Sequence, residues 1–78
     1  MDPESLEREE NRRIRELRRT IDLVGVALCT EPLTVDDALD LVNFARRRTL
    51  ELFPGTEDTF ELIYAPRLAR IIRERFGA

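Results

Sequence analysis

The chain is predicted to be all-α, a single three-helix bundle-like domain over residues 1–78 with a long first helix. Apolar residues recur every three or four positions through most of the sequence, which is the period of an amphipathic helix. Pro32 and the Pro54–Gly55 pair divide the chain into three segments of helical length. Residues 20–29 are apolar on nearly every face, and so short a chain cannot easily cover them alone. We therefore expect a homodimer.

The first helix is expected over residues 3–30. Asp2–Pro3 is a typical helix start, because Asp accepts from free N–H groups and Pro fits the first turn. Pro32 ends the helix, since it disfavours helical geometry at the residue before it. The apolar residues of one face lie three and four positions apart, as in a coiled coil: Ile14, Leu17, Ile21, Val24 and Leu28. Residues 1–10 are expected to project beyond the second helix or to fray.

The second helix is expected over residues 35–53. Thr34 is its N-cap, and Asp37 stands three residues later, where a capping box places an acceptor. The pair Pro54–Gly55 stops the helix and makes a turn.

The third helix is expected over residues 57–76, capped by Thr56 and ended by Gly77. Pro66 lies inside it and removes one backbone hydrogen bond, which predicts a kink. The apolar side of this helix is supplied by Phe60, Ile63, Tyr64, Leu68, Ile71, Ile72 and Phe76.

A strand over residues 20–29 is the main alternative to this layout. Thr, Ile and Val favour strands, and Gly25 weakens a helix by about 1 kcal/mol. No other segment offers this strand a partner, so the helix is the favoured reading.

The composition limits the chemical functions that we expect of this chain. All 13 basic residues are Arg, the net charge is −3, and there is no His. Without His the chain lacks the commonest general base and metal ligand, so we expect no catalytic residue, no metal and no cofactor. The single Cys29 cannot form an intrachain disulfide, which favours a reducing, cytoplasmic location. No apolar run reaches the ~20 residues that span a membrane.

Three apolar residues fall outside the predicted core. Leu23 and Val26 point away from the inner face of the first helix, and Phe44 lies on the polar face of the second. Exposed apolar patches mark association sites, so these residues, with Leu6 in the projecting segment, are the candidate interface. The alternative is that the third helix covers them.

Arginines form the second candidate site. The candidate basic patch, which is expected to bind an anion or nucleic acid if its two clusters converge, comprises Arg15, Arg18, Arg19, Arg46, Arg47 and Arg48. The alternative is a solvated face balanced by carboxylates. Arg46 falls within the apolar arc of its helix, where it either extends its stem over apolar surface or pairs with a carboxylate such as Asp22.

The stretch Leu17–Asp22 resembles part of the first helix of the small all-helical chorismate mutases, which are dimeric three-helix enzymes. Those enzymes have a longer first helix and use a Lys, whereas this chain has no Lys and breaks at Pro32. The sequence thus predicts a non-enzymatic, self-associating interaction module. A nucleic-acid-binding or regulatory protein is the first alternative, and a small dimeric enzyme with an Arg-lined anion pocket is the second.

Overall fold

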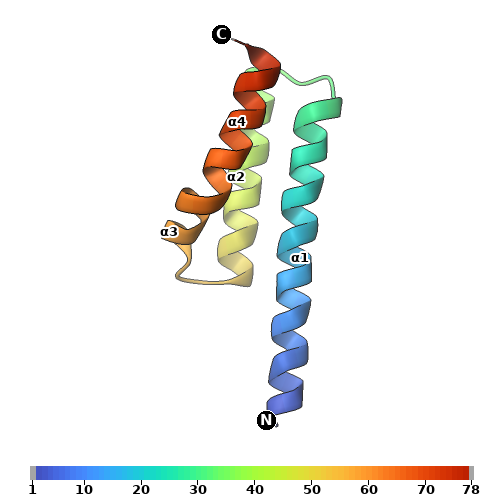
Figure 1. Ribbon diagram of the computed structural model, residues 1–78, viewed down its shortest axis with the longest axis vertical. Coiled ribbons are helices and arrows are strands. Elements are labelled where there is room, and N and C mark those ends of the chain that lie inside the picture. The colour runs from blue at the N-terminus through green and yellow to red at the C-terminus, as the bar shows by residue number, and fades with distance from the viewer. Residues whose placement is uncertain (1, 78) are drawn as a thin grey trace.

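A computed structural model describes residues 2–77. Its helices are α1 (Pro3–Thr30), α2 (Val35–Leu52), α3 (Glu57–Thr59), the π-helical η1 (Phe60–Tyr64) and α4 (Ala65–Phe76) (Figure 1). The described residues contain no strand, which confirms the all-α class. Residues 20–29 lie within α1, so the strand alternative for this segment is wrong.

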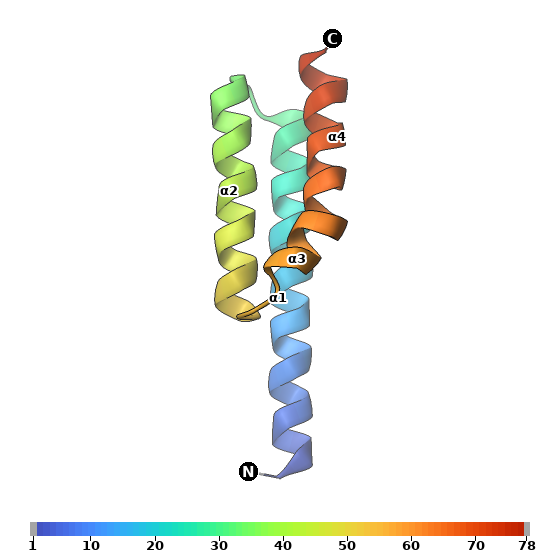
Figure 2. The ribbon, with the colours of Figure 1, turned by 90° about the vertical axis from the view of Figure 1, so that its left-hand side faces the viewer.

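Helix α1 is longer than the rest of the bundle. Asp2 caps it, because its side chain accepts from the Ser5 N–H at 2.8 Å. With 28 residues α1 is about 42 Å long at 1.5 Å per residue. Its N-terminal part extends well beyond the C-terminal end of α2, as Figures 1 and 2 show, and remains helical from Pro3 onward.

Helix α2 begins with the expected capping box. The Asp37 N–H donates to Thr34 Oγ1 at 3.1 Å, and the Thr34 N–H donates to Asp37 Oδ2 at 3.2 Å. The helix ends at Leu52, and Phe53 is its C-cap rather than its last residue. Gly55 follows with φ of 86°, a left-handed conformation that favours glycine.

The predicted third helix is interrupted before Pro66. In η1 the helix widens to π geometry, and the Ala65 N–H donates to the carbonyl of Phe60, five residues earlier. Pro66 then occupies the first turn of α4, where its missing N–H costs little. Thr56 takes the N-cap position of α3 but makes no side-chain cap; its hydroxyl donates instead to the carbonyl of Phe53 at 2.5 Å.

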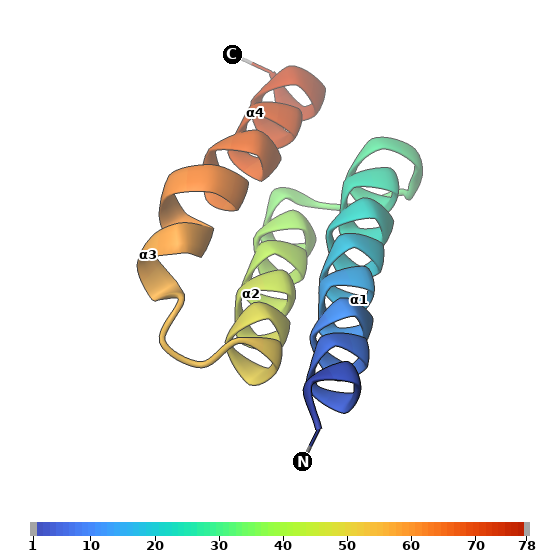
Figure 3. The same ribbon diagram turned by 60° about the horizontal axis from the view of Figure 1, so that its bottom comes forward.

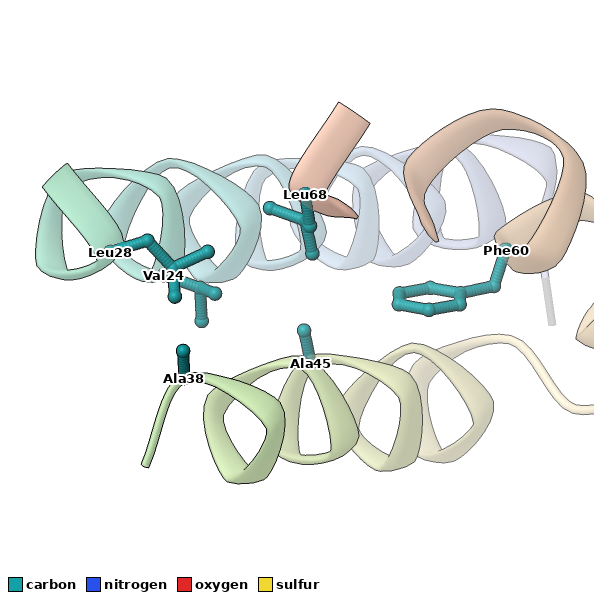
Figure 4. Packing of buried hydrophobic residues seen from close by; sticks show 6 residues of the cluster. All are labelled: Val24, Leu28, Ala38, Ala45, Phe60 and Leu68. Carbon is teal, nitrogen blue, oxygen red and sulfur yellow. The ribbon is translucent and has the colours of Figure 1, made fainter. Parts of the chain in front are cut away.

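The helices form an up-down-up bundle in which α1, α2 and α4 run side by side (Figure 3). The core is small. Figure 4 shows the Phe60 ring between α1 and α2, and Leu68 of α4 above Ala45 of α2. Within residues 2–77, six apolar residues are buried: Val24, Leu28, Ala38, Ala45, Phe60 and Leu68.

Arg75 joins the last turn of α4 to the C-terminal end of α1. Its Nη1 donates to the carbonyl of Leu28 at 2.6 Å, and its Nη2 donates to that of Glu31. The final carbonyls of a helix lack partners within the helix, and the macrodipole makes them attractive to a cation. Arg75 thereby caps α1 from a distance of 44 or more positions along the chain.

Candidate functional site

Large apolar side chains are more numerous on the surface than in the core. In the part of the chain that the structure describes, eight of them are exposed, against six buried apolar residues. The exposed set is Leu6, Leu23, Val26, Val35, Leu39, Phe44, Leu62 and Ile63. Contiguous exposed apolar surface on a small domain marks a binding or association site.

Four of these eight exposed residues form the interface predicted from the sequence. The structure leaves Leu23 62% exposed, Val26 58%, Phe44 47% and Leu6 54%, so α4 does not cover them. Leu6 lines a different hollow, with Phe53, and lies about 25 Å from Leu23 along α1. Leu6 is therefore not part of the same surface.

Leu23, Val26 and Phe44 are linked through Ala27. On α1, Val26 is three residues and Ala27 four residues from Leu23, so each of them neighbours Leu23 on the helix surface. Ala27 lines one hollow together with Phe44 and Leu41 of α2. We call these five residues the α1–α2 strip: Leu23, Val26, Ala27, Leu41 and Phe44.

The two ends of the strip carry opposite charges. At one end is a hollow of about 410 Å³, the basic end, lined by Arg15, Arg18, Arg19 and Asp22 beside Leu23 and Val26. At the other is a hollow of about 560 Å³, the acidic end, lined by Glu31, Asp37 and Asp40 beside Ala27, Pro32, Leu33, Leu41 and Phe44. Within residues 2–77, Arg15, Arg18, Glu31 and Asp40 make no ion pair, so these charges are available to a partner.

The structure divides the two arginine clusters. Arg46 points toward η1, where its Nε donates to Glu61 Oε1 at 2.6 Å and its guanidinium lies 5.3 Å from the Phe60 ring centroid. Its carboxylate partner is Glu61, and not Asp22. Arg48 pairs with Glu51 at 3.1 Å and with Glu16 at 3.9 Å.

Arg47 is exposed and makes no ion pair among the described residues. Arg15, Arg18 and Arg19 line the basic end without Arg46, Arg47 or Arg48. Among residues 2–77, Arg18 and Arg46 therefore do not line a common hollow.

The helical period of the sequence does not predict the exposure of two residues near the π turn. Ile63 was expected on the apolar side of the third helix but is exposed, and its neighbour Leu62 is 77% exposed. The π turn displaces the residues after Phe60 around the helix axis relative to an α-helix, so the 3.6-residue period fails there. Pro66 was the one sequence signal for this irregularity.

Among the described residues, no group of three or more Cys, Asp or Glu side chains is arranged to hold a metal ion. No helix over residues 2–77 is both long and apolar enough to cross a membrane. Comparison with protein families, with curated proteins and with solved structures gives no match.

Proposed function

We propose that this chain is a non-enzymatic interaction module that self-associates through the α1–α2 strip. The observation that carries this proposal is the exposure of Leu23, Val26 and Phe44 within the strip, on a domain with only six buried apolar residues among residues 2–77. A domain of 78 residues is marginally stable alone, and association is one way to supplement its core.

Sedimentation equilibrium at micromolar concentration tests this proposal. The wild-type chain is expected to associate, and Leu23→Glu to weaken association by about tenfold or more, because it places a charge in the apolar centre of the strip. Leu62→Glu is the matched control, since Leu62 is also an exposed leucine but lies on η1, away from the strip. A wild-type chain that remains monomeric would refute the proposal.

The nucleic-acid alternative has less support. Three arginines line the basic end, but the same face of the bundle also carries the carboxylates Glu31, Asp37 and Asp40. A phosphate backbone that followed this face would meet both charges, whereas a protein partner with its own charge pattern can match both. A titration with duplex DNA at two salt concentrations distinguishes the two, because phosphate contacts weaken steeply with salt.

A further inference from the structure

We propose that this chain binds the phosphate backbone of duplex nucleic acid along the outer side of α1. The residues that make the contact, which we call the arginine ridge, are Arg8, Arg12, Arg15, Arg18 and Arg19. The ridge goes beyond the proposed self-association, because it runs from the basic end of the α1–α2 strip toward the N-terminus of α1, onto the part of the helix that projects beyond α2 (Figures 1 and 2).

The spacing of the arginines places them on one side of α1. Steps of four, three and four residues lead from Arg8 through Arg12 and Arg15 to Arg19, and such positions are neighbours on a helix. At about 100° per residue, all five members of the ridge fall within an arc of about 120°. Each of them is exposed. The ridge is therefore one continuous basic surface about 16 Å long.

The ridge faces away from the rest of the bundle. The buried residues of α1 are Thr20, Val24 and Leu28, and the middle of the arc lies about 180° around the helix from Val24. Figures 1 and 3 show α1 at one edge of the bundle, with α2 and α4 both on the same side of it. The other helices therefore leave the arginine ridge open to a ligand.

The carboxylates of the same stretch lie beside the arc and not within it. They are Glu9, Glu10 and Glu16, and helical spacing places each of them about 40° or more outside the arc. Glu9 approaches Arg12 at 3.8 Å and Glu16 approaches Arg19 at 3.7 Å, which are loose, exposed contacts of little strength. The members of the ridge that form no ion pair among the described residues are Arg8, Arg15 and Arg18.

The side chains of the ridge favour phosphates over a protein or a membrane as the ligand. Between Arg8 and Arg19 the arc contains one other residue, Asn11, and therefore no apolar or aromatic side chain. A protein interface is expected to have an apolar centre, and a membrane-surface helix inserts apolar side chains into the lipid. Stacking on single-stranded bases needs aromatic rings. Guanidinium groups bind phosphate in a two-pronged manner, and the release of counterions from a duplex supplies affinity without apolar contact.

The carboxylates that oppose nucleic acid along the α1–α2 strip lie in the other direction. Glu31, Asp37 and Asp40 line the acidic end, whereas a duplex that follows the ridge runs from the basic end toward the N-terminus of α1. The net charge of −3 is a property of the whole chain, and a local basic surface can outweigh it. At 0.1 M salt the Debye length is about 10 Å, so carboxylates on the far side of the bundle are largely screened from the ligand.

Fluorescence anisotropy of a labelled DNA duplex of about 20 base pairs, titrated with the chain from about 0.05 to 0.2 M salt, tests the proposal. We expect micromolar binding at the lowest salt. The logarithm of the association constant should fall with the logarithm of the salt concentration with a slope of about −3 to −4, as for about four phosphate contacts. Two duplexes of different sequence should bind equally well, because phosphate contacts carry no sequence information.

Substitutions on the projecting part of α1 locate the site. Arg8→Gln with Arg12→Gln should weaken binding by about tenfold or more at 0.1 M salt and make the slope shallower by about 2, because two phosphate contacts are lost. Gln keeps the helix propensity of Arg, and circular dichroism checks the fold. Arg67→Gln with Arg73→Gln is the control, since it removes the same charge from exposed positions on α4, and it should change the Kd by less than about threefold.

Three results would overturn the proposal: a wild-type chain that does not bind the duplex at 0.05 M salt, ridge and control variants that weaken binding equally, and binding to phosphatidylserine vesicles but not to the duplex. Duplex RNA of the same length offers the same phosphate chemistry, and the relative affinities show which form is preferred. The ridge variants leave Leu23 and Phe44 unchanged, so sedimentation equilibrium tests self-association separately, and either proposal can fail without the other.

Discussion

Replacement of Arg75 by Met is expected to lower the free energy of unfolding by about 2 kcal/mol. Met keeps most of the apolar stem but removes the donors to the carbonyls of Leu28 and Glu31. A charge-assisted hydrogen bond contributes roughly 1.5–3 kcal/mol when buried, and Arg75 is only half-buried, so about 1 kcal/mol for each of the two carbonyls is a fair value.

Thermal unfolding followed by circular dichroism measures this loss. For a domain of this size, 2 kcal/mol corresponds to a fall in Tm of about 10 °C. Protein concentration must be held fixed, because self-association raises the apparent stability. Arg75→Lys should recover part of the loss, since Lys keeps the charge near the end of α1 but lacks the two-pronged guanidinium.

Arg73→Met is the matched control, on the same helix turn but exposed and without an ion pair among the described residues. It should change stability by no more than about 0.5 kcal/mol. If Arg75→Met and Arg73→Met unfold at the same temperature, the capping of α1 by Arg75 does not contribute to stability.

Two further substitutions test the packing. Gly25→Ala should stabilise the chain by about 0.5–1 kcal/mol, because Gly is unfavourable within a helix and an added Cβ would meet Ile71 Cδ1 at an ordinary 3.9 Å; a lower Tm would show that α1 and α4 approach more closely than described. Phe60→Ala should cost about 3–5 kcal/mol, since Phe60 is fully buried. That is a large part of the ~4–12 kcal/mol expected for 78 residues, so much of the helical signal should disappear at 37 °C, and a Tm within 5 °C of wild type would contradict the core assignment.

Helix boundaries could be predicted from the sequence because the signals for them are local. Thr34 and Asp37 form their capping box within four residues, and Gly55 takes its left-handed conformation in the turn that Pro54 begins. Such signals need no knowledge of the neighbouring helices. The exposure of Leu23 and Val26 followed from the same short-range geometry, since the period of α1 determines which residues face away from its inner side.

Contacts between helices could not be predicted in the same way. Arg46 pairs with Glu61 because the π turn sets the rotation of Glu61 about its helix, and the α-helical period does not describe that turn. The capping of α1 by Arg75 depends on the level at which α4 ends relative to α1, which is set by packing over the whole length of the bundle. The charged ends of the strip could not be predicted either, because only the packing of α1 against α2 brings Asp37 and Asp40 beside α1.

The projecting end of α1 affects how the mass of this protein is measured in solution. The Cα radius of gyration is 14.3 Å, whereas a compact domain of 78 residues has about 11.5 Å. A radius of 14.3 Å is typical of a compact domain of about 140 residues, nearly two copies of this chain. A mass inferred from an elution volume or from a scattering radius would therefore be close to that of a dimer even for a monomer. A method that measures molar mass independently of shape is needed to distinguish monomer from dimer.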